Sequence, residues 1–574
     1  MVHLRLHQSF HWRLVILISF FLTLLAAVIL RVFSLAIVEY RRFVVAAEKQ
    51  QQIFEVLPSR RGKIFAQDKS GVLLPLAIQK SFFTLVAVPK DISDHALAAS
   101  NLGELLSVQT DDIYAKLAKA DDPYEVIARK IDDETAAGIR ALNTQGLMLV
   151  EESRRVYPQN RLAASVIGFV SYDDGEERGE YGIERAYQKE LEGDRGFFEG
   201  EKDAAGFWVS VGRRIINPPV NGADVILTID ANIQFKVEEE LISLREKWQA
   251  ESALAIAIEP SSGRILALAS SPAFDPNDYS SEKDFSVFRA PAINSQFELG
   301  SVFKPITMAA GINEGVISAT TTYQDPGRRK YGGFTVSNFD GRSYGLQTMT
   351  QVLERSLNTG AIFAAERVGK ERFWQYLQRF GFGQKAEIDF PGEVVGDISN
   401  LNAGRDVDYA TASFGQGIAI TPLQMAMAMG AIANRGILMT PYMVERIRDE
   451  AGVEELHRPT ERGEVISISS AETITKMLVS AVRNGFENRA GVNGYFVAGK
   501  TGTAQIPKKD GRGYSDEVIH TFVGYAPAFN PKFLILLQLN RPKGNRFAAN
   551  TLTPAFHNLA EFMLNYYEIP SDER

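Results

Sequence analysis

Cysteine is absent from the 574 residues of the chain, and histidine occurs only seven times. The missing thiols exclude a cysteine nucleophile, disulfide bonds and cysteine-ligated zinc, and they are compatible with an oxidising compartment. Three of the histidines, His3, His7 and His11, lie ahead of anything that looks folded. A histidine-based metal centre or catalytic triad therefore has little material to draw on.

A basic surplus is also lacking. The chain carries 62 Lys and Arg against 70 Asp and Glu, which gives a formal net charge of −8. A nucleic-acid-binding protein would show a basic surplus or stripe, and no such stripe is visible, so we expect no nucleic-acid partner. The apolar fraction of 45% is ordinary for a globular protein, and the length predicts two or three domains.

Charge is missing altogether from Leu14 to Leu30, which reads LVILISFFLTLLAAVIL. A membrane-spanning helix needs roughly 20 apolar residues. The apolar core of a cleaved signal peptide, the alternative, usually has about 7–15 residues and ends at a small-residue site. Because this run is longer and lacks a convincing site, we predict an uncleaved transmembrane helix over residues 14–38, after a tail of residues 1–13. Arginines flank the run on both sides, so the positive-inside rule does not decide its orientation.

The rest of the chain divides into two regions. Residues 39–221 mix short apolar runs with charged helical stretches and contain nothing that looks catalytic, and we expect a helical stalk over residues 40–55. Residues 222–574 begin with an alternating strand and a helix that Asp230 could cap. Further strands are expected in a hairpin at 253–271 and at 494–506, 520–527 and 532–540, with a last helix at 552–567. Strands at both ends with helices between them predict an antiparallel sheet packed with helices, an α/β (α+β) fold.

A serine and a lysine three residues apart stand in ELGSVFKPITM, residues 298–308. On a helix, Ser301 and Lys304 would share one face, and Pro305 would fix the helix start close to them. Positive potential at the helix start and burial would both disfavour a protonated lysine, so Lys304 could accept the Ser301 proton. The alternative is a helix start with an incidental serine. A second Ser-x-x-Lys, Ser280 to Lys283, lies in a polar stretch and is interpreted as a solvated loop.

Two further motifs follow in order. Ser356-Leu-Asn358 is a Ser-x-Asn, and Lys500-Thr-Gly-Thr503 lies inside a predicted strand. Gly502 in a strand usually marks a bulge or a place where another backbone or a ligand comes close. Alone, the first could be a helix turn and the second a strand edge. The three motifs together, with the third on a strand, favour a common function.

These motifs resemble those of the penicillin-recognising serine acyltransferases, that is, the penicillin-binding proteins and the serine β-lactamases. With a membrane helix and a non-catalytic N-terminal region, the chain resembles a class B penicillin-binding protein, a monofunctional peptidoglycan D,D-transpeptidase. Other segments resemble that family as well: RRGKIF (60–65), RRVYPQ (154–159), GEYGIE (179–184), LTID (227–230), IEPSSGRILALAS (258–270), FGQGIAITPLQ (414–424) and KTGTAQ (500–505). After RRGKIF the chain departs from the usual Asp-Arg-Asn-Gly-like turn.

The resemblance implies a fold and domain plan. A pedestal, or dimerisation-like, domain would occupy residues 39–221. A transpeptidase domain of the penicillin-binding and serine β-lactamase fold would occupy residues 222–574. The catalytic domain would lie outside the cytoplasm, anchored to the bacterial inner (cytoplasmic) membrane by a single span, because cross-links are made there.

The resemblance also implies the chemistry. Ser301 would attack the penultimate D-Ala of a stem peptide that ends in D-Ala-D-Ala, with Lys304 as the base. Ser356 would relay a proton to the leaving amine, and Asn358 would bind the substrate backbone. The family needs no metal or organic cofactor, and β-lactams acylate the same serine.

The third motif would bind the substrate. Lys500, Thr501 and Thr503 would hold its terminal carboxylate, and Gly502 would let the donor lie against the strand as an added strand. The backbone N–H groups of Ser301 and Thr503 would form the oxyanion hole.

Several alternatives stay open. A D,D-carboxypeptidase would hydrolyse the same acyl-enzyme, and a serine β-lactamase would be a smaller secreted domain. A catalytically silent scaffold would use the N-terminal region to recruit wall-synthesis proteins. The compact length and FGQGIAITPLQ resemble division-type more than elongation-type enzymes, and division-type partners would be a membrane-embedded lipid-II glycosyltransferase and single-span division proteins. The charged loop 507–517 is expected to be a mobile hairpin loop, or alternatively a lid.

Overall fold

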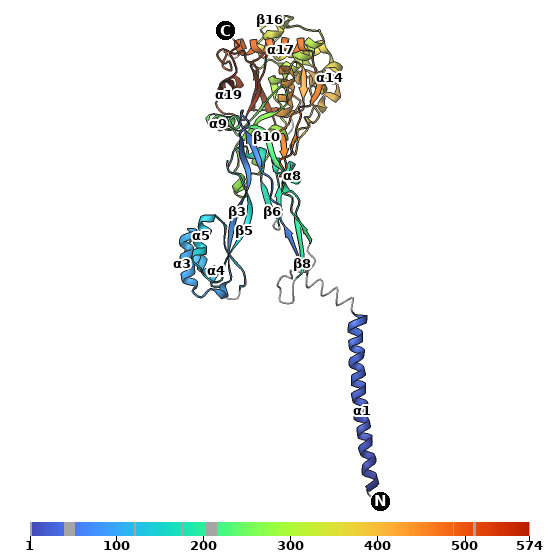
Figure 1. Ribbon diagram of the computed structural model, residues 1–574. Coiled ribbons are helices and arrows are strands. Elements are labelled where there is room, and N and C mark those ends of the chain that lie inside the picture. Colours follow the sequence, from blue (N-terminus) through green and yellow to red (C-terminus); the bar gives the residue numbers. More distant parts are fainter. Residues whose placement is uncertain are drawn as a thin grey trace. The chain divides into compact units, whose positions relative to one another are not determined.

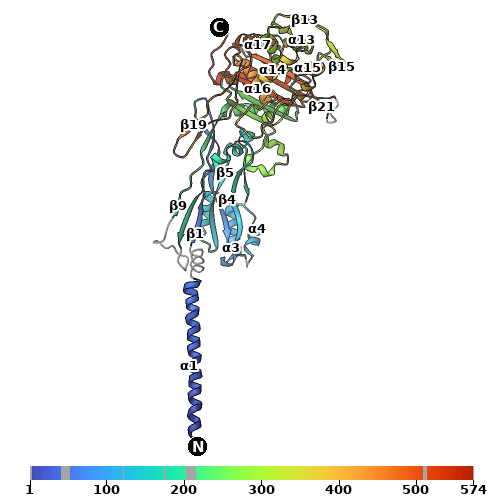
Figure 2. The same ribbon diagram turned by 90° about the vertical axis from the view of Figure 1, so that its right-hand side faces the viewer.

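The computed structural model describes residues 3–39, 52–119, 122–173, 176–201, 215–485, 487–508 and 513–572. They form two compact units. One contains Met1–Ser59 with Gly193–Val220, and the other contains Arg60–Glu192 with Asn221–Arg574. Figures 1 and 2 show the elements of each unit.

The first unit contains a long apolar helix and a small sheet. Helix α1 (His3–Phe33) continues into a π-helical turn at Ser34–Val38. Its stretch Leu14–Ile37 is long and apolar enough to cross a membrane, and none of it is buried by protein. Strands β1 (Gln52–Leu57), β8 (Gly196–Glu201) and β9 (Ile215–Asn217) form an antiparallel sheet. The expected stalk lies outside the described residues up to 51, and residues 52–55 belong to β1 instead of a helix because they pair with β8.

The second unit contains a seven-stranded sheet in the order β19-β18-β10-β2-β3-β4, with β5 also paired to β3. Its strands are β2 (Ile64–Gln67), β3 (Leu73–Ala87), β4 (Glu125–Ile131), β5 (Leu147–Val156), β10 (Asp224–Asp230), β18 (Val444–Arg448) and β19 (Glu454–Leu456). Figure 1 shows helices α3 (His95–Leu106), α4 (Thr110–Leu117) and α5 (Asp133–Ala141) gathered beside β3 and β5. These helices share a separate core with the strands, centred on Leu85, Leu102 and Leu117.

Strand β10 lies in a different sheet from the one that we predicted. We predicted it in the same sheet as the C-terminal strands, but it lies between β2, which is parallel to it, and β18, which is antiparallel. Its residues from Val225 onward are buried, so the apolar pattern identifies a buried strand without naming the sheet to which it belongs. The expected helix cap is confirmed: the Asp230 side chain accepts hydrogen bonds from two backbone N–H groups at the start of α9 (Ala231–Lys247).

Three of the family-like segments meet in a buried cluster of charges. The Glu184 carboxylate accepts from Arg61 Nε at 2.8 Å and from Arg155 Nε at 2.6 Å. The Glu184 side chain is 0% exposed, and the arginine side chains are 2% and 1% exposed. Burial alone would raise the pKa of Glu184, but the two guanidinium groups outweigh it and hold that pKa below its usual range. RRGKIF, RRVYPQ and GEYGIE are therefore joined by one ion-pair network.

The C-terminal strands form a five-stranded antiparallel sheet in the order β12-β11-β23-β22-β21. They are β12 (Ile265–Ser271), β11 (Ser252–Ile258), β23 (Phe533–Asn540), β22 (Tyr514–Ala526) and β21 (Ala498–Pro507). The predicted hairpin at 253–271 is confirmed as β11 and β12. Helices α9 and α19 (Thr553–Tyr566) contact each other and pack on the sheet. A second group of helices that contact one another consists of α11 (Lys304–Asn313), α16 (Pro422–Ala433) and α17 (Ile468–Ser480). Strand β21, which carries Lys500 to Thr503, lies at the edge of this sheet.

Candidate active site

Ser301 lies in a 3₁₀ turn, Gly300–Phe303, that leads directly into α11. We expected an α-helix to begin near Gly300, but the α-helix begins at Lys304 with Pro305 in its first turn. The tighter turn favours the predicted pairing, because residues i and i+3 of a 3₁₀ helix are eclipsed. Ser301 and Lys304 therefore project to the same side.

Lys304 is fully buried. Its Nζ donates to the backbone oxygen of Ser356 at 2.5 Å and contacts Ser356 Oγ at 3.2 Å. Burial holds the pKa of Lys304 well below its ordinary value, and the nearby charge of Lys500 adds to the shift. A neutral amine has two N–H donors and one lone pair. The two contacts to Ser356 match the donors, which leaves the lone pair for the Ser301 proton.

The Ser301 hydroxyl itself makes no hydrogen bond within the described residues. Within the described residues Lys304 Nζ donates to Ser356, and no hydrogen bond joins it to the Ser301 hydroxyl. Catalytic hydrogen bonds are often long without substrate and tighten only in the reacting complex.

Ser356 lies between helices α12 (Met349–Glu354) and α13 (Asn358–Val368). Its φ of 57° places it in the left-handed region, where residues with a side chain are uncommon. Its Oγ lies 3.2 Å from Lys304 Nζ and 3.0 Å from Lys500 Nζ. A hydroxyl has two acceptor lone pairs, so Ser356 can bind both lysines at once. The strained backbone places one hydroxyl between two amines.

Asn358 begins α13 beside that serine. Its Nδ2 donates at 2.8 Å to the backbone oxygen of Ser337, at the end of strand β15 (Phe334–Ser337). The β14–β15 hairpin, whose first strand is Arg328–Tyr331, is therefore attached to the predicted substrate-binding asparagine. The predicted hydrogen bond from a substrate N–H would go to the side-chain carbonyl of Asn358, because Nδ2 already donates to Ser337.

The third motif lies on edge strand β21. Lys500 is fully buried, and burial lowers its pKa to about 7. Its Nζ also donates to the backbone oxygen of Thr501 at 2.9 Å. Thr501 and Thr503 are half-buried. Lys500 Nζ lies 3.4 Å from Thr501 Oγ1, and Thr503 Oγ1 accepts from the backbone N–H of Ala548 at 3.2 Å. The structure thus connects Lys304, Ser356 and Lys500 directly.

Gly502 is explained by a close approach of backbone. A Cβ added there would lie 2.5 Å from the backbone oxygen of Leu299 and 3.1 Å from a methyl group of Val302. The close neighbour in the structure is therefore the segment that carries Ser301. Glycine lets β21 and the nucleophile turn touch, which fixes Ser301 beside the Lys500 strand.

We expect Gly502→Ala to force these two segments apart. A clash with backbone should destabilise the protein by about 1–3 kcal/mol, and the rate of Ser301 acylation by a penicillin should fall with it. The matched control is Gly333→Ala, since a Cβ at Gly333 meets nothing within 4 Å. Thermal unfolding and acylation rates of both variants check this. A Gly502→Ala variant as stable and as reactive as Gly333→Ala would contradict this reading of the glycine.

Sequence reasoning missed Glu298, three residues before Ser301. Burial raises the pKa of Glu298 to about 7, and its carboxylate accepts from Tyr514 Oη at 2.9 Å. Tyr514 opens β22, so this bond attaches the β21–β22 hairpin to the nucleophile segment. The signal available in the sequence was an acidic residue, Glu298, in the otherwise uncharged segment that leads to Ser301. Ser280 and Lys283 of the second Ser-x-x-Lys are both exposed, as expected, but Ser280 lies in a 3₁₀ segment (Pro276–Ser281) instead of a loop.

Comparison with known families identifies both regions of the chain. The penicillin binding protein transpeptidase domain matches residues 253–561, and the penicillin-binding protein dimerisation domain matches residues 56–227. The chain belongs to the penicillin-binding proteins. A dimerisation domain followed by a transpeptidase domain is the plan of class B members, while the exact boundary at 221/222 stays a prediction.

Individual relatives are similar to this chain over most of its length. Stage V sporulation protein D of Bacillus subtilis is 33% identical over 505 residues, which cover 87% of this chain and 77% of the relative. A peptidoglycan D,D-transpeptidase FtsI homolog of Mesostigma viride is 27% identical, with 94% and 93% covered. Among solved structures, penicillin-binding protein 3 of Mycobacterium tuberculosis, complexed with aztreonam, superposes with a TM-score of 0.69 at 27% identity and covers 90% of this chain and 98% of its own. The α/β fold and the penicillin-binding class are thereby confirmed.

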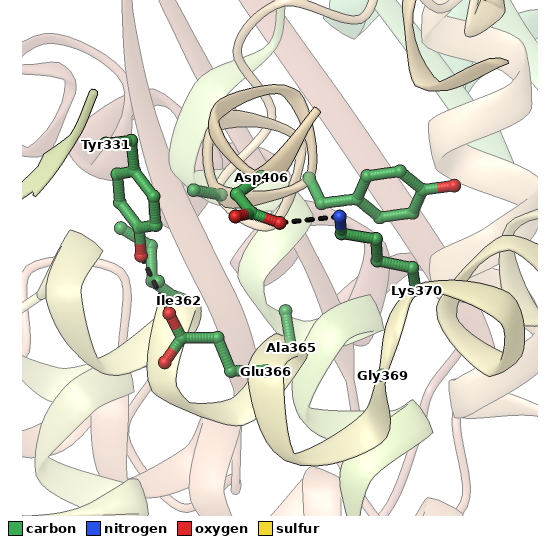
Figure 3. A pocket seen from close by; sticks show the side chains of 9 residues that line it. Tyr331, Ile362, Ala365, Glu366, Gly369, Lys370 and Asp406 are labelled. Atoms are coloured by element: carbon green, nitrogen blue, oxygen red, sulfur yellow. Dashed lines mark hydrogen bonds and ion pairs between the residues drawn. The ribbon is translucent and has the colours of Figure 1, made fainter. Parts of the chain in front are cut away.

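A cavity of about 300 Å³ lies elsewhere in the same region. It is lined by residues of α13 and by Tyr331, Lys370, Asp406 and their neighbours (Figure 3). Its charges are paired: Lys370 with Asp406 at 2.5 Å, and Glu366 with the Tyr331 hydroxyl at 2.8 Å. None of the eight predicted site residues lines it. It adds nothing to the chemistry of Ser301.

Proposed function

We propose that this penicillin-binding protein is a serine-type peptidoglycan D,D-transpeptidase whose nucleophile is Ser301. The single observation that carries the assignment is the buried chain from Lys304 through Ser356 Oγ to Lys500, with distances of 3.2 Å and 3.0 Å. It supplies a neutral base, a hydroxyl relay and a cation in one site without a histidine. The names of the relatives and the penicillin-binding fold support the same reaction.

The first half-reaction forms the acyl-enzyme. Ser301 Oγ attacks the carbonyl carbon of the penultimate D-Ala, and its proton passes to neutral Lys304. The backbone N–H groups of Ser301 and Thr503 receive the oxyanion. The intermediate then expels the terminal D-Ala, whose nitrogen takes the proton from Lys304 through Ser356. Charged Lys500, with Thr501 and Thr503, holds the carboxylate of the departing residue.

The second half-reaction releases the acyl group. The neutral amine of a second stem peptide attacks the ester carbon and gives its proton to Lys304. Ser301 leaves as the alcohol when the proton returns to its oxygen. A new amide bond replaces the ester, so the enzyme ends in its initial state and the two stem peptides are cross-linked.

The rate of acylation should pass through a maximum as the pH rises. Lys304 must be neutral to act as the base, so kcat/KM should fall as the pH drops through its lowered pKa. Lys500 must be charged to bind a carboxylate, and its pKa is about 7, so kcat/KM should fall again as the pH rises above that value. Penicillin acylation rates measured across pH check this. In Lys500→Arg the alkaline fall should vanish, and an unbroken rise with pH in the wild type would contradict the assignment.

One experiment separates transfer from hydrolysis. The purified protein is given a thioester or peptide donor ending in D-Ala, with and without a D-amino acid as acceptor amine, and the products are separated. A transpeptidase forms the amide product, and the amide replaces the hydrolysis product as the acceptor concentration rises. A D,D-carboxypeptidase gives only the hydrolysed donor. A catalytically silent scaffold consumes neither compound.

We further propose where the protein works and with which partners. The apolar helix supports a single-pass anchor, and the chemistry supports the cytoplasmic membrane of a bacterium with the transpeptidase domain outside the cytoplasm. The FtsI homolog among the relatives supports septal wall synthesis over elongation. Its macromolecular partners would then be a lipid-II glycosyltransferase and single-span division proteins. β-Lactams would acylate Ser301 as covalent inhibitors.

A further inference from the structure

Two exposed phenylalanines contact each other, one in a segment bonded to the Ser-x-Asn motif and the other in a segment bonded to strand β21. Phe339 follows strand β15, and Phe547 precedes the short helix α18 (Ala548–Thr551). Their ring centroids lie 5.3 Å apart in an edge-to-face arrangement. Phe339 is 38% exposed and Phe547 is 47% exposed, so the contact is not part of the core. Aromatic pairs of this geometry attract each other beyond the area that they bury.

Each ring is attached to a different motif. Two residues before Phe339, the backbone oxygen of Ser337 accepts from Asn358 Nδ2 at 2.8 Å. Directly after Phe547, the backbone N–H of Ala548 donates to Thr503 Oγ1 at 3.2 Å. One phenylalanine is thus connected to Asn358 of the Ser-x-Asn motif, and the other is connected to Thr503 on strand β21. Figure 2 shows β15 and β21 on the same side of the domain.

A third residue, Arg546, contacts one of the two rings. The guanidinium of Arg546 lies 5.0 Å from the centroid of the Phe339 ring. A cation over an aromatic face is attracted to it and limits the orientations of the ring. We call Phe339, Arg546 and Phe547 the aromatic arch.

The arch closes a circuit of contacts around the space in which a donor would bind. Strand β21 and the Ser-x-Asn segment are also joined directly, by the 3.0 Å contact between Lys500 Nζ and Ser356 Oγ. A donor laid along β21, as the proposed function has it, would lie between these two contacts. One contact is buried and involves the catalytic groups, whereas the other is exposed and consists of two rings that can separate.

We propose that the aromatic arch determines which acyl donors reach Ser301. The inference rests on the proposed function, and it adds the specificity-determining residues Phe339 and Phe547. A donor with a slender chain next to its scissile carbonyl fits while the rings stay in contact. A donor with a rigid, branched group at that position must first separate the rings. The arch therefore slows branched donors by the free energy of one aromatic contact.

The test compares two penicillins on the purified full-length protein. Benzylpenicillin has a flexible side chain, and methicillin has a rigid side chain branched at both ortho positions. In Phe339→Ala and in Phe547→Ala, the acylation rate with methicillin should rise about three- to tenfold relative to the rate with benzylpenicillin, which is the value of one broken ring contact. The double variant should show no larger change than the stronger single variant, since all three lose the same contact. An unchanged or lower ratio in the single variants would overturn the proposal.

A matched control removes another exposed phenylalanine from the same hairpin. Phe334 begins β15 and is 62% exposed. Phe334→Ala should leave the ratio of the two rates at its wild-type value, and an equal rise there would overturn the role of the arch. Benzylpenicillin acylation of the wild type reports the proposed function, and the ratio of the two penicillins reports the arch, so the two ideas fail separately.

The absence of cysteine permits a second measurement. Phe339→Cys combined with Phe547→Cys would give a chain with two thiols only, which a short bifunctional thiol reagent can join. The cross-linked protein should lose acylation by methicillin relative to benzylpenicillin, compared with the same variant before cross-linking. A ratio that cross-linking does not change would contradict the proposal.

Discussion

Replacing Lys304 by methionine is expected to lower the rate of Ser301 acylation by about 10²–10⁴-fold, the usual contribution of a positioned general base. Methionine is about as long as lysine and is accepted in an apolar interior, but it offers no lone pair of comparable basicity. Because Lys304 is fully buried and its pKa is held low, the wild-type side chain is a base without any activating partner. Stopped-flow acylation with a fluorescent penicillin measures the rate.

The control for this variant is Lys370→Met. Lys370 is 46% exposed and is paired with Asp406, away from the motif residues. Its replacement should leave acylation close to the wild-type rate. If Lys304→Met reacts within about tenfold of wild type, less than a general base usually contributes, another group takes the Ser301 proton.

Glu184→Gln is expected to destabilise the protein by about 3–5 kcal/mol, the cost of breaking a buried ion pair by removing one partner. The amide keeps the shape of the carboxylate but leaves the guanidinium groups of Arg61 and Arg155 without a compensating charge. Both arginine side chains are at most 2% exposed, so water cannot replace the lost partner. Urea unfolding of the full-length protein in detergent, followed by tryptophan fluorescence, reports the loss as a lower midpoint.

Glu152→Gln is the matched comparison. Glu152 pairs with Arg154 at 2.8 Å, but their side chains are 29% and 20% exposed. Water reaches both of these half-buried side chains, and solvent-screened pairs are worth about 0–1 kcal/mol, so the midpoint should hardly move. Equal shifts in the two variants would show that the Glu184 cluster does not hold the region together.

The sequence was most informative where the signal is local. The hairpin at 253–271 and the Asp230 cap follow from residues within one or two turns of each other, and both are confirmed. The two Ser-x-x-Lys motifs were distinguished by their neighbours. Ser280 and Lys283 are exposed, whereas Lys304 is buried. Local chemistry of this kind can be inferred from composition, periodicity and caps.

Long-range contacts could not be inferred in the same way. Nothing near Lys304 predicts that its amine binds Ser356, 52 positions away, instead of Ser301. The pairing of β10 with β2 and the meeting of Arg61 with Glu184 likewise join segments that only the fold brings together. The burial of Lys500, which lowers the pKa of that lysine to about 7, could not be inferred from the sequence either. Motif order predicts the residues of the site, and the tertiary structure determines which of them are hydrogen-bonded to one another.

The most direct test of the account is covalent labelling of the purified protein with a fluorescent penicillin, wild type beside Ser301→Ala. We predict a stable label on the wild type and none on the variant. A cooperative thermal unfolding transition of each protein shows that both are folded. A label that turns over rapidly would indicate a β-lactamase. A folded wild type that takes no label, or a variant that keeps it, would contradict the assignment of Ser301 as the acyltransferase nucleophile.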